Sequence, residues 1–369
     1  MVEVGARRMA LLVVLILGGS GCGGAGPAPP AVTAPLASTP APASQLPAVT
    51  PTAPATPTPG ALRFRIASTQ AAAVAGQLLP YWVGIEAGLF RQEGLGLELV
   101  TLQSDQIALT AAANGEIDAI IGTPGPSLLA AIAGSVDAIV LGGTHNAFDQ
   151  HLIAAADVKA PTDMVGRSVL ISEKRTLNDF QTREALARIG IDADADLGGT
   201  WTGANQAERI DNLRLGNGQA TVVTPPLSAL LVREGFTDFG DLSEGPPWPG
   251  AAIVVTRRAY AQRNAYLQRF LRGLLASIQR TKADPALAQQ ALAKYTKIDD
   301  PEAVEEAYGV YGQRLLERVP YMSRDGLQRA IDYTVQGRPQ VRRLQAATLI
   351  DHTMLQRLES SGYVDSLYH

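Results

Sequence analysis

The chain has 369 residues, with 31 lysines and arginines against 35 aspartates and glutamates, and one cysteine, Cys22. This mildly acidic balance has no basic stripe or arginine cluster, so nucleic acid is not expected as a partner. A lone cysteine excludes an intramolecular disulfide. The four histidines lack zinc-ligand spacing, and no phosphate-binding loop or nucleophile elbow is present. We therefore expect no metal, no cofactor and no catalytic residue.

The first 22 residues have the pattern of an export signal. Arg7 and Arg8 precede an apolar run over 9–17, and small residues lead into Cys22. The run is shorter than the roughly 20 residues that a membrane-spanning helix needs. Residues 19–22 (GSGC) resemble a bacterial lipobox, which implies a lipid anchor on Cys22. Gly19 stands where that pattern prefers leucine, so an ordinary signal with an incidental Cys22 remains open.

Residues 23–60 form a linker of mostly proline, alanine, threonine and serine. Such a composition buries too little apolar surface to offset chain entropy, so we expect an extended, disordered tether. At ~3.1 Å per residue in a polyproline conformation, it would reach on the order of 100 Å.

The remaining residues, about 310 in number, alternate strand and helix patterns and are enough for two lobes. Strands are predicted at 62–68, 95–99, 117–122, 138–141, 169–172, 220–223 and 252–256. Helices are predicted at 81–90, 107–113, after Pro126, and at 176–189, 208–215 and 227–234, with a helical tail from Arg257. The alternation predicts an α/β fold with mostly parallel sheets covered on both faces.

Three strings then occur in an order that resembles a known family. They are PYWVGIEAGLF at 80–90 followed by EGL at 93–95, AAANGEIDA at 111–119, and MVGRSV at 164–169. Together they resemble the nitrate/sulfonate/taurine-type binding proteins of ABC transporters and their relatives that bind thiamine-pyrimidine precursors. The resemblance implies the two-lobed type II periplasmic-binding fold with a hinge and an interlobe cleft. Lobe one would be 62–153 plus 250–369, and lobe two 154–249.

The resemblance also implies a role. The protein would be a monomeric receptor, not an enzyme, lipid-anchored at the outer face of the cytoplasmic membrane or in the periplasm. It would capture a small organic or oxyanion solute and deliver it to an ABC permease and ATPase complex. A receptor for a membrane signalling partner is an alternative. A thiamine-pyrimidine-synthase-like enzyme is another, but such enzymes use a cysteine-rich motif, and Cys22 precedes the fold.

Ligands of open parallel sheets bind beyond the carboxyl ends of the strands. The candidate ligand-binding residues are the polar and aromatic side chains at those positions. They are Ser68, Thr69, Tyr81, Trp82, Thr123, Thr144, His145, Asn146 and Phe148 in lobe one, and Ser172, Thr176, Trp201 and Thr224 in lobe two.

The turn from Ser172 to Thr176 departs from the family. Many relatives have a Gly/Ser-rich turn here whose backbone amides bind an anion, whereas this chain reads SEKRT. Lys174 or Arg175 could bind an anionic ligand through its charge. Alternatively, Glu173 pairs with one of them and the turn is a solvated surface, which is the interpretation we favour.

Overall fold

The computed structural model describes residues 62–70 and 76–369. The expected signal peptide (1–22), its Cys22 and the linker (23–60) lie outside these residues. The described residues belong to one compact unit.

The first sheet has the order β2-β1-β3-β10-β4. Its strands are β1 (Leu62–Ser68), β2 (Leu95–Thr101), β3 (Ala119–Gly122), β4 (Ala138–His145) and β10 (Gly250–Thr256). β1 runs parallel to β2 and β3, and β10 runs antiparallel to both β3 and β4. The carboxyl ends of β1, β3 and β4 therefore lie at one edge of this sheet.

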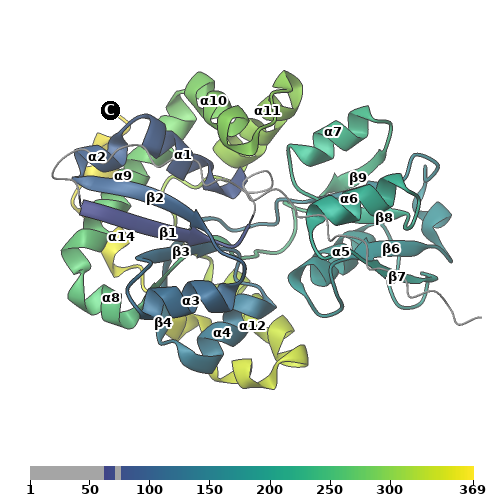
Figure 1. The fold of residues 1–369 in the computed structure, drawn as a ribbon, viewed down its shortest axis with the longest axis horizontal. Helices are drawn as coiled ribbons and strands as arrows, with labels where there is room; N and C mark the ends of the chain where they lie inside the picture. The colour runs from purple at the N-terminus through teal and green to yellow at the C-terminus, as the bar shows by residue number, and fades with distance from the viewer. Residues whose placement is uncertain (1–61, 71–75) are drawn as a thin grey trace, which may run out of the picture. The chain divides into compact units, whose positions relative to one another are not determined.

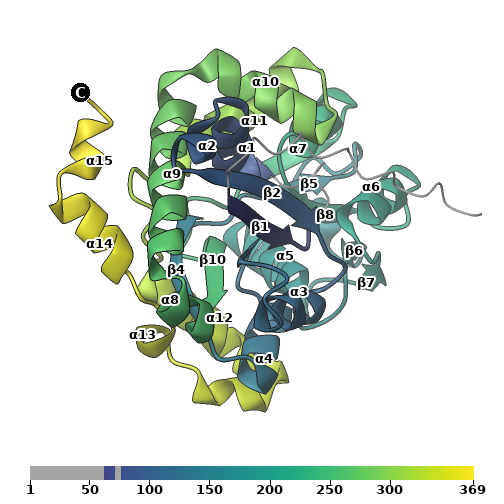
Figure 2. The same cartoon turned by 60° about the vertical axis from the view of Figure 1, so that its left-hand side comes forward.

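Helices cover both faces of the first sheet, because alternate side chains of each strand point to opposite faces. Phe64 and Ile66 belong to an apolar cluster with α1 (Leu79–Glu86) and α9 (Asn264–Ala283). Ala67 belongs to a second cluster with α3 (Asp105–Ala113) and α4 (Pro126–Ser135). Figures 1 and 2 show these two helix pairs on opposite sides of the sheet.

Five further strands form the second part of the molecule. β5 (His151–Ala154) lies between β8 (Ala220–Val223) and β9 (Thr237–Asp241) and is antiparallel to both, and β6 (Ser168–Ile171) pairs in parallel with β7 (Gly199–Thr202). The Gln219 N–H donates to the Ser168 carbonyl at 2.7 Å, and the Thr221 hydroxyl to the Leu170 carbonyl at 3.0 Å. These contacts advance in one direction along β6 and β8. The two-stranded sheet β6-β7 therefore lies beside β8 of the three-stranded sheet β8-β5-β9.

We call the part built on the first sheet the first lobe and the part from His151 to Asp241 the second lobe. The chain passes from one sheet to the other between His145 and His151 and returns between Asp241 and Gly250. The sequence-based prediction places the lobe boundaries between residues 153 and 154, a position inside β5, and between residues 249 and 250.

The other helical elements complete both lobes and the tail. They are η2 (Gly76–Leu78), α2 (Leu89–Gln92), η3 (Pro161–Met164), α5 (Leu177–Arg188), α6 (Gln206–Arg214), α7 (Leu227–Arg233), α8 (Arg257–Gln262), α10 (Pro285–Thr296), α11 (Pro301–Tyr308), η4 (Gly309–Arg314), α12 (Arg324–Gly337), η5 (Pro339–Arg343), α13 (Ala346–Leu349), α14 (Thr353–Ser360) and α15 (Tyr363–Ser366). Within the described ranges, no helix has the length and apolar content needed to cross a membrane.

The strands and helices predicted from the sequence are present, with two kinds of difference. The helix expected at 81–90 is broken into α1 and α2 at Gly88, whose φ of 69° ends α1 in a left-handed turn. The sequence pattern also did not indicate β5, β7 and β9. These strands have only four or five residues, and β7 and β9 are partly exposed, so they lack a long apolar pattern.

Candidate functional site

The loops that follow β3 and β6 bring the two lobes into contact. Gly125 lies in the turn after β3, directly before α4, and Leu177 is the first residue of α5, which follows β6. A Cβ atom placed on Gly125 would lie 3.2 Å from the Cβ of Leu177. The carboxyl ends of strands from both lobes therefore meet here, which is where open α/β sheets bind ligands.

Hydrogen bonds connect polar side chains along the first lobe's part of this edge. Gln77 is only 3% exposed, and its amide nitrogen donates to Oε1 of Gln70 at 2.8 Å. The Thr123 hydroxyl donates to Oε1 of Gln77 at 3.4 Å, and the Ser68 hydroxyl accepts the backbone N–H of Gln70 at 3.3 Å. Ser68 and Thr123, which the sequence selected, thus lie in one network with two glutamines that it did not.

Tyr311 enters the same region from the π-helical turn η4. Its hydroxyl donates to Oδ2 of Asp149 at 2.8 Å. Burial raises the pKa of Tyr311 well above its usual value, and the negative charge of Asp149 raises it further. A Cβ on Gly76 would lie 2.2 Å from the Tyr311 ring, so this close approach requires glycine at position 76. Tyr311 is therefore a neutral donor at physiological pH.

Thr224 supplies the second lobe's contribution. It follows β8 and is 6% exposed. The amide nitrogen of Gln206 donates to its hydroxyl at 3.0 Å, and Oε1 of Gln206 accepts its backbone N–H at 3.2 Å. The nearby Thr224 hydroxyl partly offsets the rise in the pKa of Tyr311. This contact joins the lobes through polar side chains.

We call this set of residues the strand-end cluster. Its members are Ser68, Gln70, Gln77, Thr123, Asp149, Gln206, Thr224 and Tyr311. The set offers amide and hydroxyl donors and acceptors and one carboxylate, but contains no lysine or arginine. Chemically, it can bind a small solute by directional hydrogen bonds from both lobes.

Thr69, Ser172 and Thr176 lie at neighbouring strand ends. The Thr69 hydroxyl donates to Oδ1 of Asp105 at 3.0 Å; burial raises the pKa of Asp105, while this hydrogen bond lowers it. The hydroxyls of Ser172 and Thr176 are 2.9 Å apart, and Thr176 caps α5 by accepting the Asp179 N–H at 3.3 Å. These predicted residues therefore lie at the expected edge, but in local hydrogen bonds of their own.

Tyr81 and Trp82 are placed in the core instead. Tyr81 is fully buried, its ring centroid lies 6.3 Å from that of Phe270, and burial raises the pKa of its hydroxyl. Trp82 is 1% exposed and stacks on Tyr295 at 5.1 Å. The physical reason is that α1 is apolar on all sides and packs between the sheet, α9 and α10.

Thr144, His145 and Asn146 have structural partners in the first lobe. β4 is longer than predicted, so Thr144 and His145 are buried strand residues, and burial lowers the pKa of His145. Asn146 donates from its amide to the Tyr321 carbonyl at 2.8 Å and accepts the Ser323 N–H at 2.6 Å. Asn146 therefore fixes the helical tail to the end of β4.

Phe148 lies in a second contact between the lobes, which we call the aromatic junction: Phe148, Phe180, Trp248 and Tyr333. Trp248 stacks on Phe148 at 4.9 Å and lies 4.7 Å from Phe180, whose ring is 4.3 Å from Tyr333. Trp201, by contrast, is 52% exposed on β7 and takes part in neither contact.

The tail helix α12 strengthens the aromatic junction. Its Arg329 donates to Oε2 of Glu184 in α5 at 2.7 Å, and the guanidinium lies 5.1 Å from the Phe180 ring centroid. The Tyr333 hydroxyl donates to the Thr176 carbonyl at 3.2 Å. The carboxyl-terminal tail thus binds the second lobe directly.

A cavity of about 390 Å³ opens beside this junction, between the turn at 173–176 and the end of α12 with η5. We call it the basic pocket, because Lys174, Arg175 and Arg338 line it and Glu173 is its one acidic residue. Within the described chain, Glu173 forms no ion pair with either neighbouring cation. Glu173, Lys174 and Arg175 are all exposed, as the solvated-surface interpretation expects, although the ion pair that it included is not seen.

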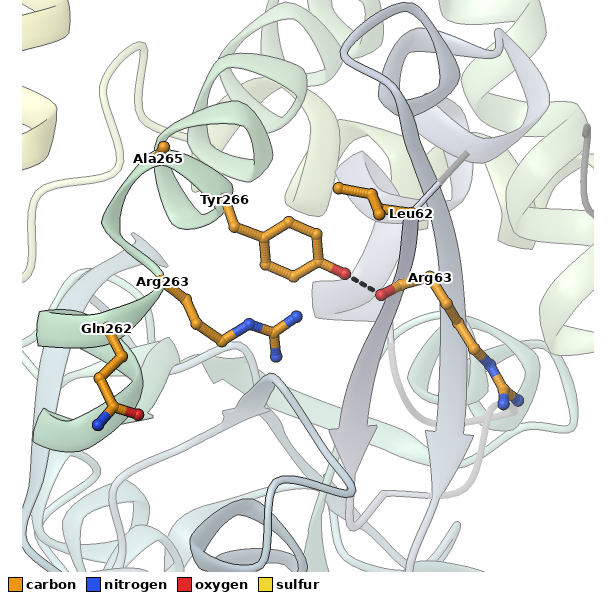
Figure 3. Close-up of a pocket in the computed structure, with 6 residues that line it drawn as sticks. All are labelled: Leu62, Arg63, Gln262, Arg263, Ala265 and Tyr266. Atoms are coloured by element: carbon orange, nitrogen blue, oxygen red, sulfur yellow. Dashed lines mark hydrogen bonds between the residues drawn. The ribbon is translucent and has the colours of Figure 1, made fainter. Parts of the chain in front are cut away.

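Two other cavities lie away from the strand ends that bring the lobes together. One, of about 380 Å³, is lined by Leu62, Arg63, Gln262, Arg263, Ala265 and Tyr266, at the amino end of β1 (Figure 3). Its arginines are already paired, Arg263 with Asp118 and Arg63 with Glu98. The other, of about 490 Å³, lies at the amino end of β4, where Arg257 pairs with Asp137. Neither contains a residue of the second lobe.

The sequence pattern did not mark five members of the strand-end cluster: Gln70, Gln77, Asp149, Gln206 and Tyr311. Gln206 opens a helix just after an asparagine cap, a signal that could have been used. Tyr311 lies in the tail, far along the chain from the strand ends it reaches, and no local pattern marks it.

The sequence model of the NMT1-like family matches residues 74–295. The chain belongs to the NMT1-like family. No protein in the curated collection matches it at a significant level.

Solved structures resemble the chain over most of its length. The alkanesulfonate-binding protein SsuA from Xanthomonas axonopodis pv. citri, bound to MOPS, has 16% identity and a TM-score of 0.59, covering 78% of this chain and 98% of that one. The periplasmic nitrate-binding protein NrtA from Synechocystis PCC 6803 has 14% identity and a TM-score of 0.62, covering 82% and 89%. The desulfurization enzyme DszB has 15% identity and a TM-score of 0.60, covering 81% and 99%. The predicted type II periplasmic-binding fold is confirmed.

Proposed function

We propose that this NMT1-like protein is an extracytoplasmic receptor that binds a small solute between its lobes and delivers it to an ABC importer. The observation that carries the proposal is the strand-end cluster, where Tyr311 of the first lobe lies near Thr224 of the second. Residues from both lobes can contact one solute only when the lobes are close together. The solute therefore favours the closed form, which is what a transporter needs to recognise a loaded receptor.

The strand-end cluster suggests how the solute is held. Gln70, Gln77 and Thr123 would bind it from the first lobe, and Gln206 and Thr224 from the second. Their hydrogen bonds to one another satisfy these buried groups in the structure described. A solute would exchange those bonds for its own, which leaves no buried polar group without a partner.

The fold alone does not separate a receptor from an enzyme, because a desulfurization enzyme shares it. We favour a receptor since the strand-end cluster holds no cysteine; the chain's one cysteine, Cys22, precedes the fold. A thermal-shift screen of the full chain should find a solute that raises the melting temperature without being converted. If the protein converts a substrate and binds no solute unchanged, it is an enzyme and the receptor proposal is wrong.

The membrane anchor is part of the same proposal. Cys22 would carry the lipid, and residues 23–60 would hold the lobes away from the membrane surface. Cys22→Ser should move the protein from the membrane fraction to the soluble fraction of cells, while Ser20→Ala should leave it membrane-bound. If the Cys22→Ser protein stays with the membrane, lipid attachment at this residue is excluded.

A further inference from the structure

The basic pocket contains cations that the rest of the protein does not neutralise. The guanidinium groups of Arg175 and Arg338 make no ion pair or hydrogen bond with any residue in 62–70 or 76–369. The pKa of Asp194 is lowered mainly by its hydrogen bond to Arg183. Lys174 lowers it further, but only through its charge. With Glu173 as the one acidic lining residue, the pocket has an excess of two positive charges.

The backbone holds one of these cations in an unfavourable conformation. Arg175 has φ of 63°, in the left-handed region that residues other than glycine adopt at a cost. Oδ2 of Asp179 accepts its backbone N–H at 2.7 Å and so fixes the turn. Its side chain passes Gly337, where a Cβ would lie 3.2 Å from Cδ of Arg175. Glycine at position 175 would adopt this conformation without strain. The chain has arginine there instead, so the strain accompanies the presence of a guanidinium group in the pocket.

The pocket also joins the two lobes. Lys174 and Arg175 belong to the second lobe, whereas Arg338 follows α12, which packs on the first lobe at α4. Next to it, Arg329 of α12 binds Glu184 of α5. An anion held by all three cations would therefore contact both lobes at once. Its volume of about 390 Å³ is in the lower part of the range for small-molecule sites and is larger than a bare oxyanion needs.

We propose that the basic pocket binds a small molecule with two negative charges on oxygen atoms, a phosphate ester or a dicarboxylate, and thereby holds the lobes together. Two guanidinium groups and an ammonium group match the charge and the planar oxygen pairs of such a ligand. The pocket shares no residue with the strand-end cluster, so the inference goes beyond the proposed function and does not depend on it. By linkage, an anion that favours the closed form tightens solute binding, and the solute tightens anion binding.

The test measures thermal shifts of the full chain with inorganic phosphate and succinate as dianions and with nitrate and methanesulfonate as monoanions, at constant ionic strength. Both dianions should raise the melting temperature in a saturable manner, and the monoanions should bind at least about tenfold more weakly. The proposal is wrong if neither dianion gives a saturable shift of the melting temperature. It is also wrong if all four anions give equal shifts.

The variants use a matched pair. Arg175→Gly removes the guanidinium and relieves the strain, so the melting temperature without anion should not fall, while the dianion shift is lost. Lys297→Gly is the control, because Lys297 is an exposed residue with φ of 62° outside the pocket; it should keep the full shift. Arg338→Gln, at an exposed side chain, should weaken dianion binding about tenfold or more. Wild-type dianion shifts in both Arg175→Gly and Arg338→Gln would show that the anion binds elsewhere and would overturn the proposal.

Discussion

The two contacts between the lobes differ in kind. The strand-end cluster is made of amides, hydroxyls and one carboxylate, and its members are joined by individual hydrogen bonds. The aromatic junction is made of four large rings and the Arg329 guanidinium, with Trp248 only 1% exposed. A polar contact can exchange its bonds for those of a solute at little net cost, whereas separating packed rings exposes apolar area.

This difference assigns separate tasks to the two contacts. We infer that the aromatic junction, which includes Tyr333 from the tail helix α12, supplies most of the attraction that keeps the lobes close. In the proposed receptor, the strand-end cluster would supply selectivity, because its donors and acceptors must be matched one by one. Substitutions in each contact test that division, and the largest effect is expected in the aromatic junction.

Trp248→Ala should destabilise the protein by about 3–5 kcal/mol, since it removes a fully buried aromatic side chain and leaves a cavity. Chemical denaturation measures the change in the free energy of unfolding. Trp201→Ala is the matched control, because Trp201 is 52% exposed; its effect should stay within about 0.5 kcal/mol. Equal losses in the two variants would contradict the assignment of the aromatic junction as the main apolar contact.

Tyr311→Phe should cost about 1–2 kcal/mol, because it leaves the partly buried Asp149 carboxylate without its hydroxyl donor while keeping the ring. Tyr321→Phe is a suitable control, since that hydroxyl donates to Glu359 in an exposed setting. The same denaturation measurement applies. A loss in Tyr311→Phe no greater than in the control would mean that the strand-end cluster is not a tightly coupled network.

His151 gives a smaller, pH-dependent effect at a third contact, where the second lobe faces α11. Burial lowers the pKa of His151, but the hydrogen bond and charge of Asp238, with Asp241 and Glu306, overcome this and raise it. Because the folded-state pKa exceeds the unfolded value of about 6.5, this stabilisation is complete below that pH. It is lost as the pH rises through the folded-state pKa.

His151→Gln should therefore flatten the decline of stability over the range that begins at about pH 6.5 and extends upward. The measurement is the free energy of unfolding of both proteins across that range. His352→Gln is the control, because burial lowers the pKa of His352, so this change should not reduce the decline. A decline that is as steep in His151→Gln as in the wild type would exclude His151 as its source.

The order of strands and helices could be predicted from the sequence because the core residues alternate regularly. Phe64 and Ile66 mark β1. Gly115, Gly190 and Gly216 end α3, α5 and α6 in left-handed turns. The short strands β7 and β9 lacked this regularity, and their pairing is set by contacts with strands distant in the chain.

The candidate site could be predicted only in part. Ser68, Thr123 and Thr224 were found because they directly follow strands. Tyr81 and Trp82 also begin an element after a strand, but their rings are needed in the core. Tyr311 could not be found this way, because its place depends on how the tail packs across both lobes. Residues that end strands are thus visible in the sequence, whereas residues brought in by tertiary packing are not.

The central claim is that one solute contacts both lobes at the strand-end cluster. The most direct test is a thermal-shift and calorimetric screen of the full chain with nitrate, alkanesulfonates, pyrimidines and aromatic acids. It is repeated with Gln77→Ala in the first lobe, Thr224→Val in the second, and Trp201→Ala as control. We predict a solute whose affinity falls in both cluster variants and not in the control. A solute that binds all three variants as tightly as the wild type would contradict the account.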